Sequence, residues 1–404
     1  MPWKDLSVIE QREEFVKLAL APGANKSEVC RRFSISREKG YKWLKRFSCE
    51  GRAGLCDRSR RPKKSPERTP ESMERAVLTI RAESNNAWGG RKIANVLERE
   101  GRVHIPAPST ITEILRRHGK LHQNAPEHPG PFRRFEHEAP NDLWQMDFKG
   151  HFAMQRLRCH PLTVLDDHSR YSLGLEACAN EQDQTVRERL SRVFKRYGLP
   201  YRMLMDNGSP WGDSRDNPYT IFTVWLMQLG IRVTHGRPYH PQTQGKDERF
   251  HRTLKAEVLA NKTFADCASV QKAFDTWRHR YNFERPHQAL GMNVPASRYR
   301  ASQRPFPEQL PEVVYDHADI VRKVSDTGWV SLRARHWRIS KAFRGKRIAL
   351  RPTAADGILS VNFGAHKIGT INLHEKETCG FMDIARPMPT SPQVNHHHNK
   401  KTII

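Results

Sequence analysis

Long apolar runs and paired cysteines are missing from this sequence, and each absence excludes a class of protein. No apolar run approaches the roughly 18 residues that a membrane-spanning helix needs. The start, Met1-Pro2-Trp3-Lys4-Asp5, has no apolar signal segment. The seven cysteines contain no Cys-x-x-Cys pair, which fits reduced thiols in a cytoplasmic protein. We therefore expect a cytoplasmic protein with no membrane partner.

Acidic residues are also scarce: the 404 residues include 44 Asp and Glu but 69 Lys and Arg. The formal charge is +25 and the isoelectric point about 10.1, which favours a polyanionic partner such as nucleic acid. A basic protein with a merely solvated surface is the alternative. Residues 31–64 argue against it, because they hold 13 Lys or Arg and only 3 acids. A chain of this length should contain more than one domain.

Residues 1–65 are predicted to form a helix-turn-helix domain. Its helices are expected at Leu6–Leu20, at Lys26–Phe33 after a capping box begun by Asn25, and at Arg37–Phe47 after the cap Ser36. In such a domain the third helix enters the major groove of DNA. An ordinary small helical bundle is the alternative, and the basic tail that follows favours DNA. The third helix is expected to turn Tyr41, Leu44 and Phe47 inward. The candidate DNA contacts are Lys42, Lys45 and Arg46, with Arg60 and Arg61 in the tail.

A second helix-turn-helix-like domain is expected at residues 66–122. Its helices are predicted at Glu74–Ala82, at Arg91–Glu100 and after the cap Ser109. Arg116 and Arg117 are assigned to the outer face of the third helix. Residues 123–139 are rich in Pro, His and Arg and are interpreted as a linker.

Residues 140–302 alternate strand and helix patterns, as in a mixed-sheet α/β domain. The strands are expected at Leu143–Phe152, Leu162–Leu165, Tyr171–Leu175, Tyr201–Met205 and Ile231–Thr234, and the helices at Thr185–Tyr197, Ile221–Leu229, Gly245–Leu259 and about 264–283. Short strands punctuated by glycines then predict a small β-barrel at 310–390. Residues 391–404 are expected to be a disordered tail.

Three acids stand where metal-binding carboxylates would be needed. Asp147 lies in a short apolar stretch that predicts a strand, Asp206 ends the apolar run Met203–Met205, and Glu248 begins a helix. A strand, a strand end and a helix start can bring three carboxylates together. Such a cluster is the usual way to hold two divalent cations for phosphodiester chemistry.

Four motifs carry a resemblance to a known family. They are Trp144-Gln145-Met146-Asp147, Asp206-Asn207-Gly208-Ser209, the segment Tyr-His-Pro-Gln-Thr-Gln-Gly-Lys-Asp-Glu-Arg-Phe-His from Tyr239, and Tyr281-Asn282-Phe283-Glu284-Arg285-Pro286-His287. Together they resemble the insertion-sequence transposases with a retroviral-integrase-type core, closest to the group numbered four-eighty-one. The resemblance covers nearly the whole chain. It implies a multidomain α/β protein with an RNase H-like catalytic core and an Asp-Asp-Glu triad at Asp147, Asp206 and Glu248.

The resemblance also implies a reaction and partners. Two Mg²⁺ ions, for which Mn²⁺ can substitute, would be held by the triad. The same site would cut a transposon end to leave a 3′-hydroxyl and then join that hydroxyl to target DNA. Double-stranded DNA is the expected partner, in a homodimer or larger assembly, in a bacterial cytoplasm and at the nucleoid when bound. Lys246, Arg252 and Lys255 are the candidate phosphate contacts beside the metals, and Arg333, Arg335, Arg338, Arg344, Lys346 and Arg347 those of the barrel.

Asp247 competes with Glu248 for the third position. At 3.6 residues per turn, Glu248, Arg252 and Lys255 share one helix face, and Asp247 flanks the apolar side. Helix geometry therefore favours Glu248, although an exposed Glu248–Arg252 ion pair is the ordinary alternative. The stretch 211–219 lengthens the interval from Asp206 to Glu248 and is interpreted as a loop insertion.

Other acids and histidines are given structural roles. Asp166 and Asp167 lie in a turn between two strands, where Asp commonly serves turn chemistry. His287 is expected to anchor the last core helix, whereas His240 could equally touch DNA or pack in its loop. His118 and His122 echo a zinc module, but no Cys pair follows them, so zinc is rejected.

Two further functions remain open at this stage. A catalytically silent DNA-binding regulator would be free to lose at least one acid of the triad, and all three are present in intact motifs. A plain RNase H-like nuclease would leave the two helix-turn-helix regions unexplained. The sequence therefore favours a transposase.

Overall fold

The structure is a computed structural model that describes residues 7–59, 68–121, 136–212, 219–236, 245–260, 262–374 and 379–384. The chain divides into two compact units, Met1–Arg68 and Thr69–Ile404. Within the described residues, no helix has both the length and the apolar character that crossing a membrane requires. Several residues named above lie outside the described residues: Arg60, Arg61, His122, His240 and the tail 391–404.

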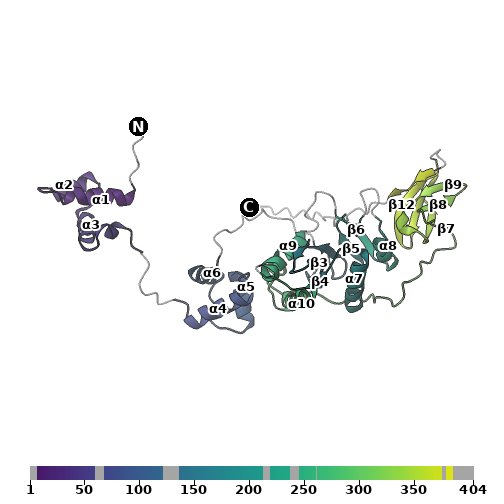
Figure 1. The fold of residues 1–404 in the computed structure, drawn as a ribbon, viewed down its shortest axis with the longest axis horizontal. Coiled ribbons are helices and arrows are strands. Elements are labelled where there is room, and N and C mark those ends of the chain that lie inside the picture. The colour runs from purple at the N-terminus through teal and green to yellow at the C-terminus, as the bar shows by residue number, and fades with distance from the viewer. Residues whose placement is uncertain are drawn as a thin grey trace, which may run out of the picture. The chain divides into compact units, whose positions relative to one another are not determined.

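Three helices and a short 3-10 helix form the first unit, drawn in purple in Figure 1. They are α1 (Val8–Ala19), α2 (Lys26–Arg32), α3 (Arg37–Glu50) and η1 (Gly51–Leu55). Both predicted N-cap residues are confirmed: the Asn25 side chain accepts from the backbone N–H groups of Ser27 and Glu28, and Ser36 accepts from that of Lys39. Of the capping box predicted at Asn25, only this half is formed. These bonds satisfy helix N–H groups that otherwise have no partner.

The inward face of α3 begins at Gly40. A Cβ atom at this position would lie 2.4 Å from the Cys30 sulfur and 3.0 Å from the Phe15 ring, so only glycine allows this close approach. The residues of α3 that pack against the core of this unit are Trp43, Leu44 and Phe47. The prediction that Tyr41 points inward is wrong, because Tyr41 is 56% exposed. One residue past Gly40, its side chain is rotated about 100° away from the core.

The second unit begins with three helices packed on one apolar cluster. They are α4 (Glu71–Glu83), α5 (Gly90–Arg99) and α6 (Pro108–Arg117). Val77, Ile93 and Ile111 are fully buried, one from each helix. Ser109 does not cap α6: Ala107 is the N-cap residue, with no side-chain bond, and Pro108 is the first helical residue. The fixed φ of proline suits that first position.

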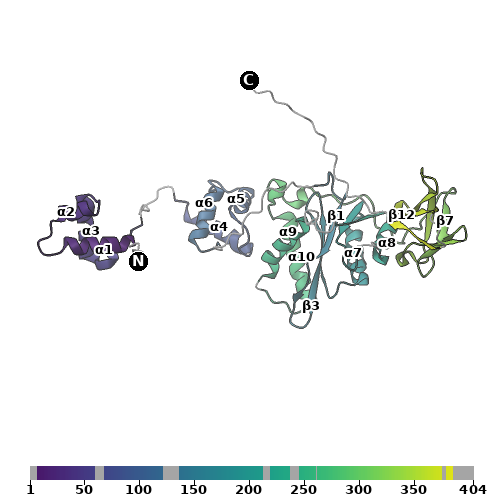
Figure 2. The ribbon, with the colours of Figure 1, turned by 90° about the horizontal axis from the view of Figure 1, so that it is seen from above.

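A six-stranded sheet forms the centre of the second unit (Figure 2). Its strands are β1 (Trp144–Phe148), β2 (Phe152–Ala153), β3 (Arg158–Asp166), β4 (Ser172–Cys178), β5 (Arg202–Met205) and β6 (Arg232–His235). β3 is antiparallel to β1, β2 and β4, whereas β1, β5 and β6 are parallel neighbours. The single strand predicted at Leu143–Phe152 is therefore two strands, β1 and β2, each of which pairs with β3.

Helices cover both faces of this sheet. They are α7 (Asp183–Tyr197), α8 (Ile221–Gln228), α9 (Gly245–Leu254), the π-helix η3 (Lys255–Leu259) and α10 (Cys267–Phe283), followed by the short η4 (Gln288–Leu290) and η5 (Pro295–Ser297). Met146 and Val164 pack with α7 and α8, whereas Leu165 and Leu175 pack with α9 and α10. Figure 2 shows the two helix pairs on opposite sides of the strands. Alternate strand residues thus serve two cores.

The C-terminal region is strand-rich. Its elements are β7 (Ile320–Lys323), β8 (Trp329–Leu332), β9 (Arg335–Arg338), η6 (Lys341–Phe343), β10 (Arg347–Pro352), β11 (Ile358–Phe363), β12 (His366–Asn372), β13 (Cys379–Phe381) and β14 (Asp383–Ile384). They form two sheets, in the orders β14-β12-β11-β10-β7 and β13-β9-β8. Val224 and Met227 of α8 belong to the same apolar core. The Tyr219 hydroxyl also donates to the Ile368 carbonyl at 2.8 Å. This region therefore docks on the helix that covers the central sheet.

The insertion predicted at 211–219 is not simply a surface loop. Within its described part, Trp211 is 1% exposed. Its ring stacks on Phe148 of β1 at 5.5 Å and meets Phe222 of α8 at 5.6 Å. The predicted insertion thus begins with a core residue. Trp211 packs beside β1, the strand that carries Asp147.

His287 has the structural role that its motif predicts. The ring is 7% exposed and meets Tyr281 edge-on at 4.7 Å. Its backbone N–H donates to the Asn293 carbonyl, which closes the turn after α10. Burial, and then the positive charges of Arg285 and Lys92, lower the pKa of His287 to about 2. This histidine is therefore neutral in the folded protein.

Acid should destabilise the protein through His287. Below a pH of 6.5, its ordinary pKa, the unfolded chain takes up a proton that the folded chain refuses. The free energy of unfolding should thus fall by up to about 1.4 kcal/mol per pH unit from this residue, and be unaffected by it above that pH. Urea unfolding at pH 7.5 and 5.5 should show a smaller difference in His287→Gln than in the unchanged protein. Equal differences would contradict the assignment.

Candidate active site

Asp147 lies on β1 and Asp206 directly follows the neighbouring parallel strand β5, at the same edge of the sheet. Trp144 pairs with Met203 and Gln145 with Leu204, so Asp147 near the end of β1 comes beside the residue that follows β5. Parallel strands expose their carboxyl ends at one edge, where ligand sites of open α/β sheets form. The sheet order therefore brings together two acids that are 59 residues apart in the sequence.

Backbone contacts fix the turn that carries Asp206. The Asp206 carboxylate accepts from the Gly208 N–H at 3.0 Å. One ring nitrogen of His235, at the end of β6, lies 2.7 Å from the Asp206 carbonyl, and the Asn207 amide donates to Gly236 at 2.9 Å. These contacts tie the end of β5 to the end of β6 and leave most of the carboxylate of Asp206 available.

Glu248 lies on the solvent-facing side of α9. Glu248, Arg252 and Lys255 are all exposed, as helix geometry predicts. Asp247 is 1% exposed, and Phe250 beside it on that face is 2% exposed. Within the described residues, the Glu248 carboxylate has no hydrogen bond or ion pair, including none to Arg252. Of the two adjacent acids, only Glu248 is placed to meet a ligand from solvent.

His251 places the Glu248 helix against the Asp147 strand. It lies one turn after Glu248, and its ring nitrogen Nδ1 is 4.0 Å from the Asp147 carboxylate. The other ring nitrogen is 2.9 Å from the Thr163 hydroxyl, which donates to the Asp147 carbonyl at 2.9 Å. Burial lowers the pKa of His251 to about 4, so its ring brings no positive charge to the site. Sequence reasoning did not identify this residue.

Negative charge accumulates at this edge of the sheet. Burial, followed by the charge of Asp206, raises the pKa of Asp147 to about 7, and Glu181 and Glu248 add to the effect. Carboxylates that repel one another in this way are arranged for a cation to neutralise. Within the described residues, no three His, Cys, Asp or Glu side chains already lie close enough to enclose a metal ion. The residue types fit divalent cations.

Glu181 was missed by sequence analysis. Its carboxylate bonds to His160 of β3 at 2.8 Å and adds to the negative potential at Asp147. A signal was present: Glu181 follows shortly after β4, and β4 runs in the same direction as β1, because both are antiparallel to β3. An acid just beyond β4 must therefore lie at the same edge as Asp147.

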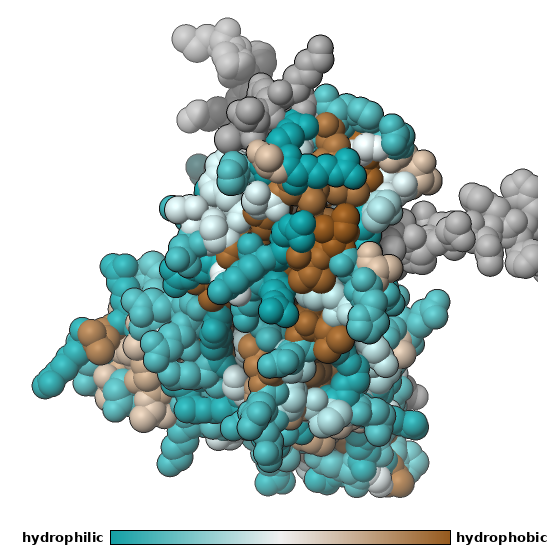
Figure 3. Space-filling view, turned by 90° about the vertical axis from the view of Figure 1, so that its right-hand side faces the viewer, coloured by the Kyte–Doolittle hydropathy of each residue, from teal (hydrophilic) through white to brown (hydrophobic). Residues whose placement is uncertain are grey.

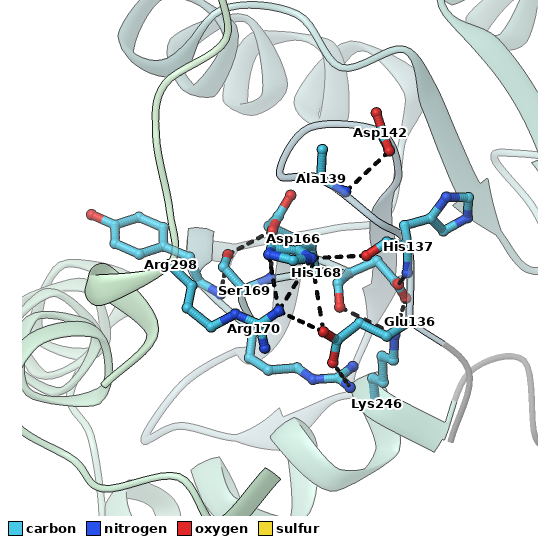
Figure 4. Close-up of polar contacts among 12 residues, drawn as sticks. Glu136, His137, Ala139, Asp142, Asp166, His168, Ser169, Arg170, Lys246 and Arg298 are labelled. Carbon is cyan, nitrogen blue, oxygen red and sulfur yellow. Dashed lines mark hydrogen bonds and ion pairs between the residues drawn. The ribbon is translucent and has the colours of Figure 1, made fainter. Parts of the chain in front are cut away.

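Asp166 and Asp167 are structural, as their position in a turn predicts. Both are fully buried. Asp166 accepts from the N–H groups of Asn141 and Ser169, each at 2.8 Å, and from the Ser169 hydroxyl at 2.6 Å. Figure 4 shows this turn surrounded by polar side chains, with Glu136 bonded to Arg298 at 2.7 Å. Residues 136–139, predicted to end a linker, therefore belong to the core.

Asp167 joins the two elements that carry Asp147 and Glu248. Its carboxylate accepts from the Gln145 amide of β1 at 2.7 Å and from the Lys246 ammonium of α9. The proposed DNA contact at Lys246 is therefore corrected: this side chain is 16% exposed and points into the protein to Asp167. Burial lowers the pKa of Lys246 to about 8, against the raising effect of Asp167. A buried carboxylate needs a partner, and Lys246 provides one for Asp167. This bond fixes the start of α9, and the Lys246 ammonium is then not available to DNA.

Lys246 and Lys255 should thus respond in opposite ways to the same substitution. Lys246→Met would leave the buried Asp167 without its cation and should lower the free energy of unfolding by about 3 kcal/mol. Lys255→Met, on the exposed face of the same helix, should leave unfolding unchanged and weaken DNA binding. Urea unfolding and DNA titrations at several salt concentrations would measure both. Unchanged stability in Lys246→Met would contradict the structural role.

The first unit presents its candidate DNA contacts around Trp43. Arg12, Lys42 and Arg46 lie over the Trp43 ring at 4.0, 5.1 and 5.1 Å. Cation–π contacts of this kind restrict flexible side chains before a ligand binds. Lys45, which follows Leu44 on α3, is exposed. All three residues proposed on α3 therefore lie at the surface of one helix.

Several other basic residues are bonded within the protein. Arg117 of α6, assigned to an outer face, pairs with the buried Glu74 at 2.7 Å. In the C-terminal region, Arg335 donates to the Leu373 carbonyl at 2.8 Å, and Lys346 donates to Gln228 at 2.8 Å. Figure 3 shows mostly hydrophilic residues on this side of the molecule, around a band of hydrophobic ones. Arg333, Arg344 and Arg347 are the exposed cations of the proposed set.

Comparisons with known families agree with this arrangement. Models described as "Integrase core domain" match residues 137–241 and 229–295, which include all three acids. A model described as "IS481 family transposase, C-terminal domain" matches residues 319–378. A helix-turn-helix domain matches residues 11–63, and a homeodomain-like domain matches residues 39–115.

Proteins of insertion elements are among the relatives. An uncharacterized 39.2 kDa protein of insertion element IS476 from Xanthomonas euvesicatoria is 30% identical over 165 residues, 41% of this chain and 46% of that protein. The chain thus spans less than half of that relative. An uncharacterized 31.7 kDa protein of IS407 from Burkholderia multivorans is 25% identical over 246 residues, 57% of this chain and 84% of that protein. A simian T-cell lymphotropic virus intasome chain aligns with 72% of this chain and 96% of its own length, at 16% identity and a TM-score of 0.35.

The mixed sheet, the helices on its two faces and the integrase-core matches define the class: a helix-turn-helix protein with an RNase H-like integrase core. The match of the C-terminal strands, together with the insertion-element relatives, makes the family more specific. The chain is thus similar to insertion-element transposases, and its C-terminal strands match the domain of the IS481 family.

Proposed function

We propose that this protein cuts the ends of a mobile DNA element and joins them to target DNA. The observation that carries the proposal is the accumulation of negative charge at the sheet edge. Asp147 on β1 and Asp206 just after β5 lie at the ends of adjacent strands. Burial and then the charge of Asp206 raise the pKa of Asp147 to about 7, and the charge of Glu248 on α9 adds to the effect. Among the described residues, α9 carries the exposed cations Arg252 and Lys255 on the same face as Glu248.

The roles of the residues follow from their positions. Asp147, Asp206 and Glu248 would hold two divalent cations, Mg²⁺ or Mn²⁺, which activate a hydroxyl nucleophile and stabilise the attacking and leaving oxygens. His251 and Thr163 keep the Asp147 strand and α9 in place. Arg252 and Lys255, exposed on the Glu248 face, would hold backbone phosphates, which positions DNA without reading its sequence.

Recognition of the element's ends would fall to the first unit. Lys42, Lys45 and Arg46 lie at the surface of α3, the helix that enters the major groove in helix-turn-helix proteins. Exposed cations of the C-terminal strands would add salt-sensitive affinity for any sequence. Two ends must be paired before joining, so we expect a homodimer or larger assembly on DNA.

Two adjacent substitutions test the site. Glu248→Gln should abolish cleavage and joining, at least 100-fold below the unchanged protein, because an amide is a poor ligand for a divalent cation. Asp247→Asn keeps the shape of a fully buried side chain and should retain most of the activity. The measurement is joining of labelled DNA, taken from the flanks of the gene, to a plasmid in Mg²⁺ and in Mn²⁺, with sequencing of the products.

Three outcomes would be distinct. Loss in Glu248→Gln alone supports the assignment, and loss in Asp247→Asn alone would move the third acid by one position. Tight end binding by the unchanged protein without cleavage, even in Mn²⁺, would instead favour a silent DNA-binding regulator.

Recognition is tested separately from chemistry. Lys45→Ala should weaken binding to the end sequence at least tenfold and affect random DNA less, because helix three reads base edges. Arg252→Ala should weaken binding to both DNAs equally and reduce its salt dependence by about one phosphate contact. Fluorescence anisotropy with both duplexes measures the difference. If both substitutions weakened binding to the two duplexes equally, Lys45 would not read the end sequence, and its proposed role would be wrong.

A further inference from the structure

The catalytic helix continues into a junction with the second helical region, residues 69–121. After α9 the chain forms the π-helix η3, which contains Glu257, nine residues beyond Glu248. π-Helical turns are rare and often occur at functional sites. The Glu257 side chain is 5% exposed, so its carboxylate is surrounded by protein.

Three donors from two regions satisfy this carboxylate. Arg285 and the Trp277 indole, both from the core, donate to it at 3.0 and 2.8 Å. The third donor is the indole of Trp88, at 3.2 Å, which comes from the loop between α4 and α5. The Asn85 amide of the same loop donates to the Glu257 carbonyl. The Glu257 carboxylate thus accepts from two indoles, that of Trp277 in the core and that of Trp88 in the second helical region.

Other contacts hold the same regions together. Trp88 is 2% exposed, and the Arg280 guanidinium of α10 lies 4.7 Å above its ring. Arg99 at the end of α5 donates to the carbonyls of Glu284 and Met292, at 3.3 and 2.6 Å. The helical region is therefore bonded to the core at both ends of α5.

A buried carboxylate is a costly way to make such a junction stable, because it must leave water. It is, however, directional: removal of one donor leaves part of a buried charge unsatisfied, so other arrangements are disfavoured. An apolar contact of the same area would tolerate sliding. The chemistry of Glu257 thus suits a contact whose geometry matters more than its strength.

We propose that the Trp88–Glu257 contact is a positioning device that fixes the helical region, residues 69–121, relative to the catalytic helix. This inference rests on the proposed function and adds a role that the acids alone do not explain. DNA held by α4–α6 would be placed at a set distance from Glu248, because Glu257 and Glu248 belong to one continuous helical segment. The nucleotide at which an end is cut would therefore depend on Trp88, a residue outside the catalytic core.

Two conservative substitutions separate this role from general stability. Trp88→Phe and Trp277→Phe each remove one indole N–H from the same carboxylate and keep an aromatic ring, but only Trp88 crosses the junction. Labelled end DNA is incubated with the full-length protein in Mg²⁺, and cut positions are read at single-nucleotide resolution. Trp88→Phe should spread cleavage over neighbouring positions and slow cutting at the normal one at least tenfold. Trp277→Phe should keep a single cut position.

A second measurement does not depend on cleavage. Amide hydrogen exchange of residues 250–259 should slow when end DNA binds the unchanged protein or Trp277→Phe. In Trp88→Phe the slowing should be lost, while the DNA is bound with an affinity within about threefold. Asn85→Ala, which removes the other bond of this loop to Glu257, should act in the same direction as Trp88→Phe.

The outcomes distinguish the two proposals. If the unchanged protein does not cut, the proposed function fails, and hydrogen exchange alone decides the positioning role. If Trp88→Phe cuts at the same single position at the normal rate, or shows unchanged exchange on binding DNA, the positioning role is overturned. An equal spread of cut positions in Trp277→Phe would also overturn it, because the effect would then come from Glu257 alone.

Discussion

The burial of one carboxylate beside another, at one edge of a parallel pair of strands, is the constraint on which the candidate site depends. Because β1 and β5 are parallel neighbours, Asp147 and Asp206 must lie together, and no cation of the described residues neutralises Asp147 directly. The protein has to hold this arrangement against its own electrostatics. The surrounding bonds serve that end: Asp167 connects β1 to α9 through Gln145 and Lys246, and His251 packs as an uncharged ring.

The same helix links the site to both of its neighbours. Its first turn is fixed by Lys246, its exposed face carries Glu248, and its π-helical end reaches the second helical region through Glu257. On the other side of the sheet, α8 contributes Val224 and Met227 to the core of the C-terminal strands. The regions that accompany the central sheet are thus attached to the helices that cover it, one on each face.

Much of the fold could be predicted because local signals are strong here. Asn25 and Ser36 cap the helices that they were expected to begin, and Gly198 ends α7 with a φ of +77° that glycine adopts readily. The four motifs that carry the family resemblance also contain the three acids. Predictions of orientation were less secure: Tyr41 points outward and Lys246 inward, because neighbours distant in the sequence, Phe15 and Asp167, decide which side is covered.

The sequence by itself determined the order of strands and helices along the chain, the resemblance to insertion-element transposases, and the exposure of Glu248 rather than Asp247, because helical periodicity places only one of the two on the exposed face. Only the tertiary structure decided which charges are available. Lys246 and Arg335, predicted as DNA contacts, and Arg117, predicted on an outer helix face, are bonded within the protein. Glu181 and Glu257, in contrast, gain their importance from strands and helices that fold beside them. The physical reason is that the state of a charged group depends on its burial and its partners, and both come from residues far along the chain.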